Sequence, residues 1–90
     1  MKTFTFYRGA DSSDAIEFEY EMTPEQYKRF VSHRRKGDSF DDCWKDPALK
    51  DICLQIWTEA EELSLAELRE WTDDESEIEN AHLWICLDYD

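Results

Sequence analysis

Apolar and polar residues alternate strictly in two stretches near the start of the chain. In residues 16–22, I-E-F-E-Y-E-M, every second side chain is apolar, and the three between them are glutamates. Residues 2–8 alternate in the same way around Phe4 and Phe6. A period of two is typical of a strand with one buried face, and residues 8–14 supply turn formers. We therefore expect an antiparallel hairpin whose core face holds Phe4, Phe6, Ile16, Phe18, Tyr20 and Met22.

After residue 22 the apolar spacing changes to that of a helix. Thr23 is suited to an N-cap, Pro24 to the first helical position, and Gln26 completes a capping box. Gly37 is suited to end this helix. A short helical turn through residues 40–44, capped by Asp38 or Ser39, is expected next.

The longest helix is predicted to start at Asp46-Pro47. Its apolar side chains recur at three- and four-residue steps over four turns, at Leu49, Ile52, Cys53, Ile56, Trp57, Ala60 and Leu63. Residues 64–67, S-L-A-E, form another capping box. Both a separate helix through residues 65–71 and a continuation of the preceding helix are compatible with this pattern.

The end of the chain returns to strand-like alternation. Residues 72–80 read as an acidic connection, and residues 82–90 as a last strand. This strand is apolar on both faces near its middle, which favours pairing on both sides or cover on both faces. Residues 1–90 are thus expected to form a single α+β domain in the order β-β-α-α-(α)-β. A small, mostly antiparallel sheet of about three strands would carry two to three helices on one face.

Composition adds a strong acidic character to this outline. The chain has a net charge of −13, with 23 acidic and 10 basic side chains. Residues 38–90 carry 17 of the acids and 3 of the bases. Such a chain repels nucleic acid and anionic membranes, so a partner selected by charge is expected to be basic. Solubility alone is the simpler explanation of the acidity.

Other chemistry finds little support in the sequence. The three cysteines, Cys43, Cys53 and Cys86, occupy no nucleophile motif, and a chain of this kind fits a reducing cytoplasm. His82 and Cys86 would stand about 13 Å apart along a strand, too far to share a zinc ion. The acidic run lacks the spacing of a calcium loop. We expect no catalytic residue, cofactor, metal or membrane segment.

The sheet face opposite the helices is the main candidate for function. It is expected to present Thr3, Thr5, Tyr7, Glu17, Glu19, Glu21, Trp84, Cys86 and Asp88. Side chains two apart on a strand are about 6.7 Å apart on the same side, so the glutamates would form a regular line of negative charge. Such a line can imitate the repeated phosphates of a nucleic-acid strand. An ordinary solvated sheet face is the alternative.

Aromatic side chains sharpen this prediction. Tyr7 and Trp84 beside the glutamates would give an aromatic centre bordered by charge, the usual anatomy of a binding hot spot. The predicted partner-binding residues are Glu17, Glu19, Glu21, Tyr7, Trp84, Asp73, Asp74, Glu75, Glu77 and Glu79. By contrast, Trp44, Trp57 and Trp71 occur among apolar residues at helical spacing and are expected in or beside the core.

These features predict a non-enzymatic interaction protein that inhibits or regulates a basic partner protein, such as a nucleic-acid-binding enzyme or a toxin. Small phage or plasmid inhibitors and bacterial immunity proteins share this general character, by analogy only. The alternative is an adaptor or assembly subunit, with a homodimer possible, whose acidity serves solubility. Salt dependence of binding separates these two hypotheses.

Overall fold

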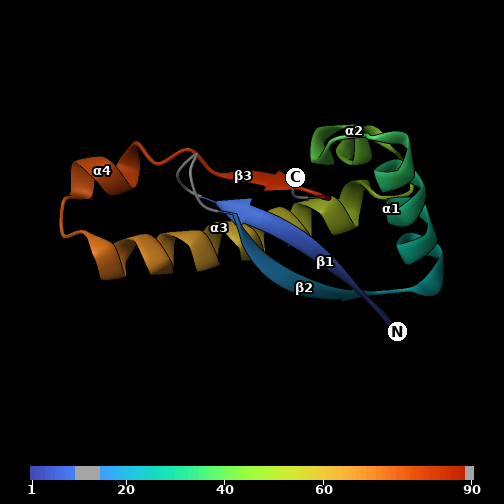
Figure 1. Ribbon diagram of the computed structural model, residues 1–90, viewed down its shortest axis with the longest axis horizontal. Coiled ribbons are helices and arrows are strands. Elements are labelled where there is room, and N and C mark those ends of the chain that lie inside the picture. Colours follow the sequence, from blue (N-terminus) through green and yellow to red (C-terminus); the bar gives the residue numbers. More distant parts are fainter. Residues whose placement is uncertain (10–14, 89–90) are drawn as a thin grey trace.

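The computed structural model describes residues 1–9 and 15–88 (Figure 1). Within these residues the chain forms a three-stranded antiparallel sheet and four helices, so the predicted α+β class and element order are confirmed. Of the turn predicted at residues 8–14, positions 8 and 9 belong to the first strand instead, and residues 10–14 lie outside the described residues. The last two positions of the predicted final strand also lie outside them. The molecule is elongated, with extents of 41 × 23 × 20 Å.

The hairpin forms as the alternation predicts. Strands β1 (Lys2–Gly9) and β2 (Ile16–Met22) pair antiparallel in an unbroken register from Lys2↔Met22 to Arg8↔Ile16. Strand β3 (Trp84–Cys86) pairs with the other side of β1, which gives the order β2-β1-β3. Of the two alternatives expected for the last strand, pairing on both sides is therefore excluded for the described residues, and Trp84–Cys86 are partly buried. This strand is a three-residue edge strand among the described residues.

The helices begin and end at local capping signals. Thr23 and Gln26 form the predicted capping box of α1 (Pro24–Lys36), and Gly37 ends the helix with a φ of 78°, which a residue without a Cβ adopts readily. Ser39, one of the two predicted candidates, caps α2 (Phe40–Lys45). These helices confirm the predicted order after the hairpin.

One continuous helix follows. Helix α3 (Lys50–Trp71) starts after a turn at residues 47–49, later than predicted, and runs through the second capping box without a break. Ser64 does not cap a new helix, because it lies inside this continuous helix, and its hydroxyl accepts a hydrogen bond from Arg8. A short helix, α4 (Glu75–Glu79), lies within the predicted acidic connection.

The core lies between one sheet face and the helices. Phe6 is fully buried, and its ring contacts those of Phe4, Phe18, Phe30 and Phe40. Two predicted core residues are less buried: Tyr20 packs at the margin, and Ile16 is 40% exposed at the hairpin end. The buried residues of the main cluster are Phe4, Phe6, Phe18, Met22, Phe30, Phe40, Cys43, Leu49, Ile52, Cys53, Ile56, Ala60 and Leu87.

Candidate partner-binding surface

The three glutamates of β2 form a row on the sheet face away from the core. Phe18 and Met22 of the same strand are buried, whereas Glu17, Glu19 and Glu21 are exposed. The register sets these glutamates beside Tyr7, Thr5 and Thr3 of β1, respectively. No salt bridge between described residues involves the row. Its carboxylates are therefore accessible to another molecule.

Tyr7 and Trp84 share this face with the row. Tyr7 is paired with Cys86, and Gly9 is paired with Trp84. The side chains of Cys86 and Trp84 therefore lie on the same side of the sheet as Tyr7. Tyr7 also stands directly across from Glu17 on the other neighbouring strand. Both aromatic residues are half-buried. The structure thus brings these five predicted residues together on one face.

The acidic run of residues 73–79 lies elsewhere. Figure 1 shows α4 beyond the end of the sheet, beside the far end of α3. Asp74 caps α4, since its Oδ1 accepts a hydrogen bond of 2.9 Å from the Ser76 backbone N–H. Asp73, Glu75, Glu77 and Glu79 are exposed. These side chains make a second acidic surface, separated from the glutamate row along the long axis.

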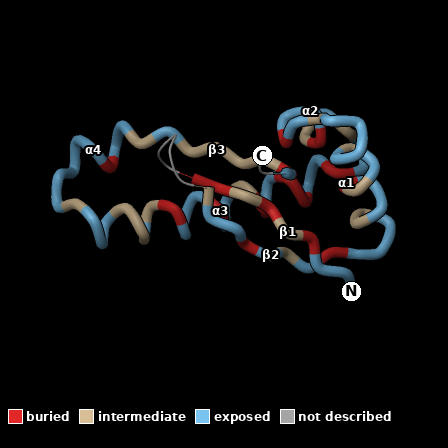
Figure 2. Tube along the Cα trace, in the orientation of Figure 1, coloured by how far each residue is buried: buried red, intermediate tan, exposed pale blue. Residues whose placement is uncertain are grey.

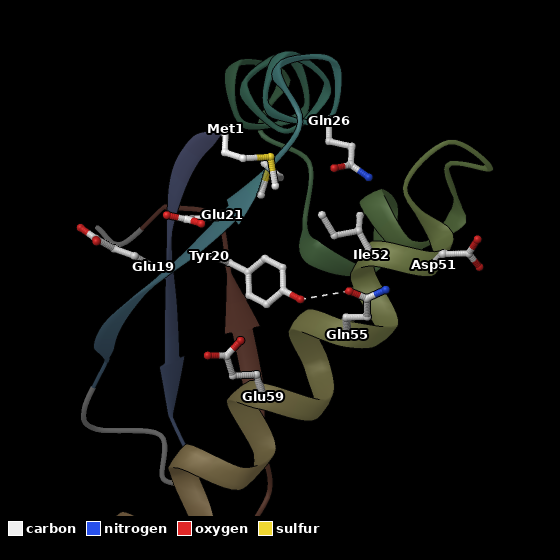
Figure 3. A pocket seen from close by; sticks show the side chains of 10 residues that line it. Met1, Glu19, Tyr20, Glu21, Gln26, Asp51, Ile52, Gln55 and Glu59 are labelled. Atoms are coloured by element: carbon white, nitrogen blue, oxygen red, sulfur yellow. Dashed lines mark hydrogen bonds between the residues drawn. The ribbon is translucent and has the colours of Figure 1, made fainter.

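A shallow cleft runs between β2 and α3. It has a volume of about 600 Å³, and Glu19, Glu21, Asp51 and Glu59 line it without any lysine or arginine side chain. In Figure 3, Tyr20 points toward α3, whereas Glu19 and Glu21 point away from it. The Tyr20 hydroxyl donates a hydrogen bond of 3.1 Å to Oε1 of Gln55. This contact joins the edge of the sheet to α3 across the cleft.

Trp71 corrects one expectation. Trp44, Trp57 and Trp71 were all predicted in or beside the core. Trp44 and Trp57 do pack against the core. Trp71 is instead 86% exposed at the last residue of α3. It follows the buried Ser64 by seven residues, or about two helical turns, so it continues the core-facing side of α3 past the end of the sheet.

Arg8 is a residue whose role the sequence pattern did not reveal. It follows Phe4 and Phe6 at two-residue steps and is 4% exposed on the core face. Its guanidinium donates to Ser64 Oγ at 3.1 Å and to both carboxylate oxygens of Glu67, at 2.8 and 3.2 Å. The two-residue alternation of the strand, continued from Phe4 and Phe6, could have predicted that Arg8 faces the core. Arg8 ties the hairpin to α3.

His33 joins two aspartates in a second polar network. Its Nδ1 lies 2.7 Å from Asp38 Oδ2, and its Nε2 lies 3.0 Å from Asp46 Oδ2. The hydrogen bond to Asp46 raises the pKa of His33, with a smaller contribution from Asp38 and opposition from burial. The same bond, with one from the Ala48 N–H, lowers the pKa of Asp46. The network ties α1 to the end of α2.

The cysteines are poorly placed for nucleophilic chemistry. Burial is the main cause that raises the pKa of both the Cys43 and Cys53 thiols to about 12. Burial also raises the pKa of Cys86. All three thiols are therefore protonated near neutral pH, whereas the thiolate is the reactive form.

No three His, Cys, Asp or Glu side chains within residues 1–9 and 15–88 converge to hold a metal ion. In the same part of the chain, no helix combines the length and apolar character that crossing a bilayer requires.

Comparison with known proteins gives no further constraint. No protein-family model, no curated protein and no solved structure matches this chain. Its function must therefore be inferred from its own residues.

Proposed function

We propose that this protein is a non-enzymatic interaction module that binds the basic surface of a partner protein, as a nucleic-acid strand would. The observation that carries the proposal is the exposed row of Glu17, Glu19 and Glu21 on one face of a paired strand. Because β2 is hydrogen-bonded to β1 along its length, the spacing of the row is fixed before binding. Preorganised groups lose less entropy when a complex forms.

The aromatic residues and the charge support the same function. Tyr7 and Trp84 lie on the face of the row and add apolar area next to charge. A net charge of −13 favours rapid association with a cationic surface. Such a protein would block the groove in which its partner binds nucleic acid, and it would thereby act as an inhibitor or regulator.

Three matched proteins test the proposal: the unchanged chain, a row variant E17Q/E19Q/E21Q, and a scattered variant E25Q/E61Q/E70Q. Both variants lose three exposed carboxylates, so their net charges are equal. Each is immobilised, and host-lysate proteins are captured at about 50 mM and about 500 mM salt. Mass spectrometry then identifies what each surface retains.

At low salt, we expect the unchanged chain and the scattered variant to retain basic proteins that the row variant does not retain. The purified partner should bind the row variant more than about tenfold more weakly, equivalent to about 1.4 kcal/mol. Double-stranded DNA should compete with the unchanged chain for that partner. Equal retention by the two variants would remove the row from the function.

Trp71 favours a second candidate function, an adaptor or assembly subunit. An 86% exposed tryptophan at a helix end is a strong anchor for a protein contact, and Leu63 of the same helix is 38% exposed. Assembly through these residues would depend weakly on salt. Analytical ultracentrifugation of the unchanged chain and W71A, at low and high salt, tests for a homodimer and for its loss.

A further inference from the structure

Strand β2 is an open edge of the sheet. In the order β2-β1-β3 it pairs with β1 along all seven of its residues, and no described strand lies on its other side. An edge strand presents unpaired N–H and C=O groups on that side, which can pair with another extended chain. The opposite edge, β3, has only three residues. The longer, uninterrupted edge is therefore β2.

This edge lacks most of the features that prevent unwanted pairing. Edge strands are commonly protected by proline, lysine, a bulge or a covering segment. The sequence of β2, I-E-F-E-Y-E-M, has no proline or lysine, and its register with β1 contains no bulge. The charges that it does carry are Glu17, Glu19 and Glu21, all on one face.

These charges select the strand that can pair. Side chains directly opposite each other on paired strands lie about 4.5–5.5 Å apart at Cβ, where like charges destabilise the pair. A second copy of β2 would bring carboxylates close to carboxylates. A strand with lysine or arginine at alternate positions would instead set a cation beside each glutamate.

The cleft beside the edge fits the other face of such a strand. Alternate side chains of an added strand would point toward α3, into the depression that β2 and α3 line. Met1, which is 83% exposed, and Tyr20 supply apolar area there, and Asp51 and Glu59 supply negative charge. Figure 3 shows Tyr20 reaching across this space to Gln55 of α3, whereas Glu19 and Glu21 point away from α3.

We propose that the free edge of β2 is a strand-addition site for an extended partner segment in which lysine or arginine alternates with β-branched residues. The main chain of that segment would extend the sheet, as in other complexes formed by β-augmentation. Its cations would lie along the glutamate row, and its β-branched side chains would enter the cleft. The inference rests on the proposed function and specifies the partner's local structure.

Three synthetic heptapeptides of equal charge test this site. The first alternates lysine and valine, beginning and ending with lysine. The second has the same sequence with N-methyl groups on alternate backbone nitrogens, which removes donors on the side that would pair. The third has the same composition in two blocks, four lysines followed by three valines. Binding is measured by titration and by amide chemical shifts of the labelled protein.

We expect the alternating peptide to bind at least about fivefold more tightly than the other two. Its binding should shift the amide signals of residues 16–22 and slow their hydrogen exchange. E17Q/E19Q/E21Q should weaken this binding, and the scattered variant E25Q/E61Q/E70Q should retain it. Valine-to-threonine replacement in the peptide should preserve binding, since threonine is also β-branched.

Two outcomes would overturn the strand-addition site, and they bear differently on the proposed function. If all three peptides bind equally and lose affinity equally with the row variant, charge alone attracts cations, and the proposed function stands without strand addition. If none binds, or if the shifts fall on α4, the β2 edge is not the site. Lysate capture by the row and scattered variants then decides the proposed function separately.

Discussion

The part of α3 that packs against the sheet and the far end of the same helix share one helical spacing of apolar residues. The two regions nevertheless differ sharply in burial. We refer to residues 65–79, which comprise the end of α3 and α4, as the arm. Thirteen residues form one buried cluster outside the arm, whereas Ile78 is the only buried residue within it. Figure 2 shows this contrast along the trace. Periodicity determines which side of a helix is apolar, but neighbouring elements determine whether that side is covered.

The largest expected contrast is between Phe6 and Trp71. Phe6→Ala removes a fully buried ring from contact with four other rings and should cost about 3–5 kcal/mol of unfolding free energy. Trp71→Ala should cost less than about 0.5 kcal/mol, because the side chain is mostly in water. Urea unfolding of both variants measures the difference. Similar losses would show that the arm is packed as tightly as the core.

The junction between these regions should show the next largest effect. Glu67→Ala leaves the Arg8 guanidinium buried without its carboxylate, at a cost of about 2 kcal/mol. The cost is below that of a fully buried pair because the Glu67 side chain is 38% exposed. Arg8→Met should cost less, since water can solvate the remaining glutamate.

Hydrogen exchange distinguishes a local effect of the junction from a global one. In Glu67→Ala, amides of residues 64–71 should exchange faster than those of β1 after correction for global stability. Uniform acceleration across the chain would contradict the role of Arg8 as a link between the hairpin and the arm.

A smaller effect is expected from pH at His33, which lies outside the arm. The pKa of His33 is raised above 6.5 in the folded protein, chiefly by its hydrogen bond to Asp46. The folded state thus binds the proton more tightly than the unfolded state. The resulting stability is present below pH 6.5 and is lost as pH rises through the raised pKa.

His33→Gln is the control for this titration. Unfolding free energies of both proteins should be measured between about pH 5 and pH 8, the range in which an imidazole gains or loses its proton. The advantage of the unchanged protein should shrink as pH rises. An advantage that grows with pH would contradict an imidazolium held between Asp38 and Asp46.

The smallest stability change is expected for the glutamate row. E17Q/E19Q/E21Q should leave unfolding free energy within about 0.5 kcal/mol of the unchanged protein, because the three side chains are exposed. Reduced repulsion along the face should make the change zero or slightly stabilising. A loss above about 1 kcal/mol would show that the row supports the fold, which would confound any binding test.

Local signals made the hairpin and α1 predictable. Strict alternation selected the buried side of β2, and the Thr23–Gln26 capping box positioned the start of α1. Residues 64–67 also resembled a capping box at the start of a helix. Ser64 instead accepts a hydrogen bond from Arg8, which is 56 positions away in the chain. Short motifs therefore predicted the structure correctly where their side chains bond within the motif. They predicted it wrongly where a side chain of the motif bonds to a residue far away in the chain.

The candidate surface was predictable to a similar extent. Period-two alternation was enough to expect Glu17, Glu19 and Glu21 on one face, and the pairing of β3 with β1 brings Tyr7 and Trp84 to it. The separation of α4 and the exposure of Trp71 depend on the length of the sheet relative to α3. That relation arises from tertiary packing and leaves no local mark in the sequence.

The position of Trp71 also makes it an intrinsic optical reporter. Trp44 and Trp57 contact each other with ring centroids 6.0 Å apart, and Trp84 is half-buried, whereas Trp71 is 86% exposed. A neutral aqueous quencher such as acrylamide should therefore reach Trp71 most readily. Protection of this emission would reveal a molecule that covers the helix end, without any attached dye.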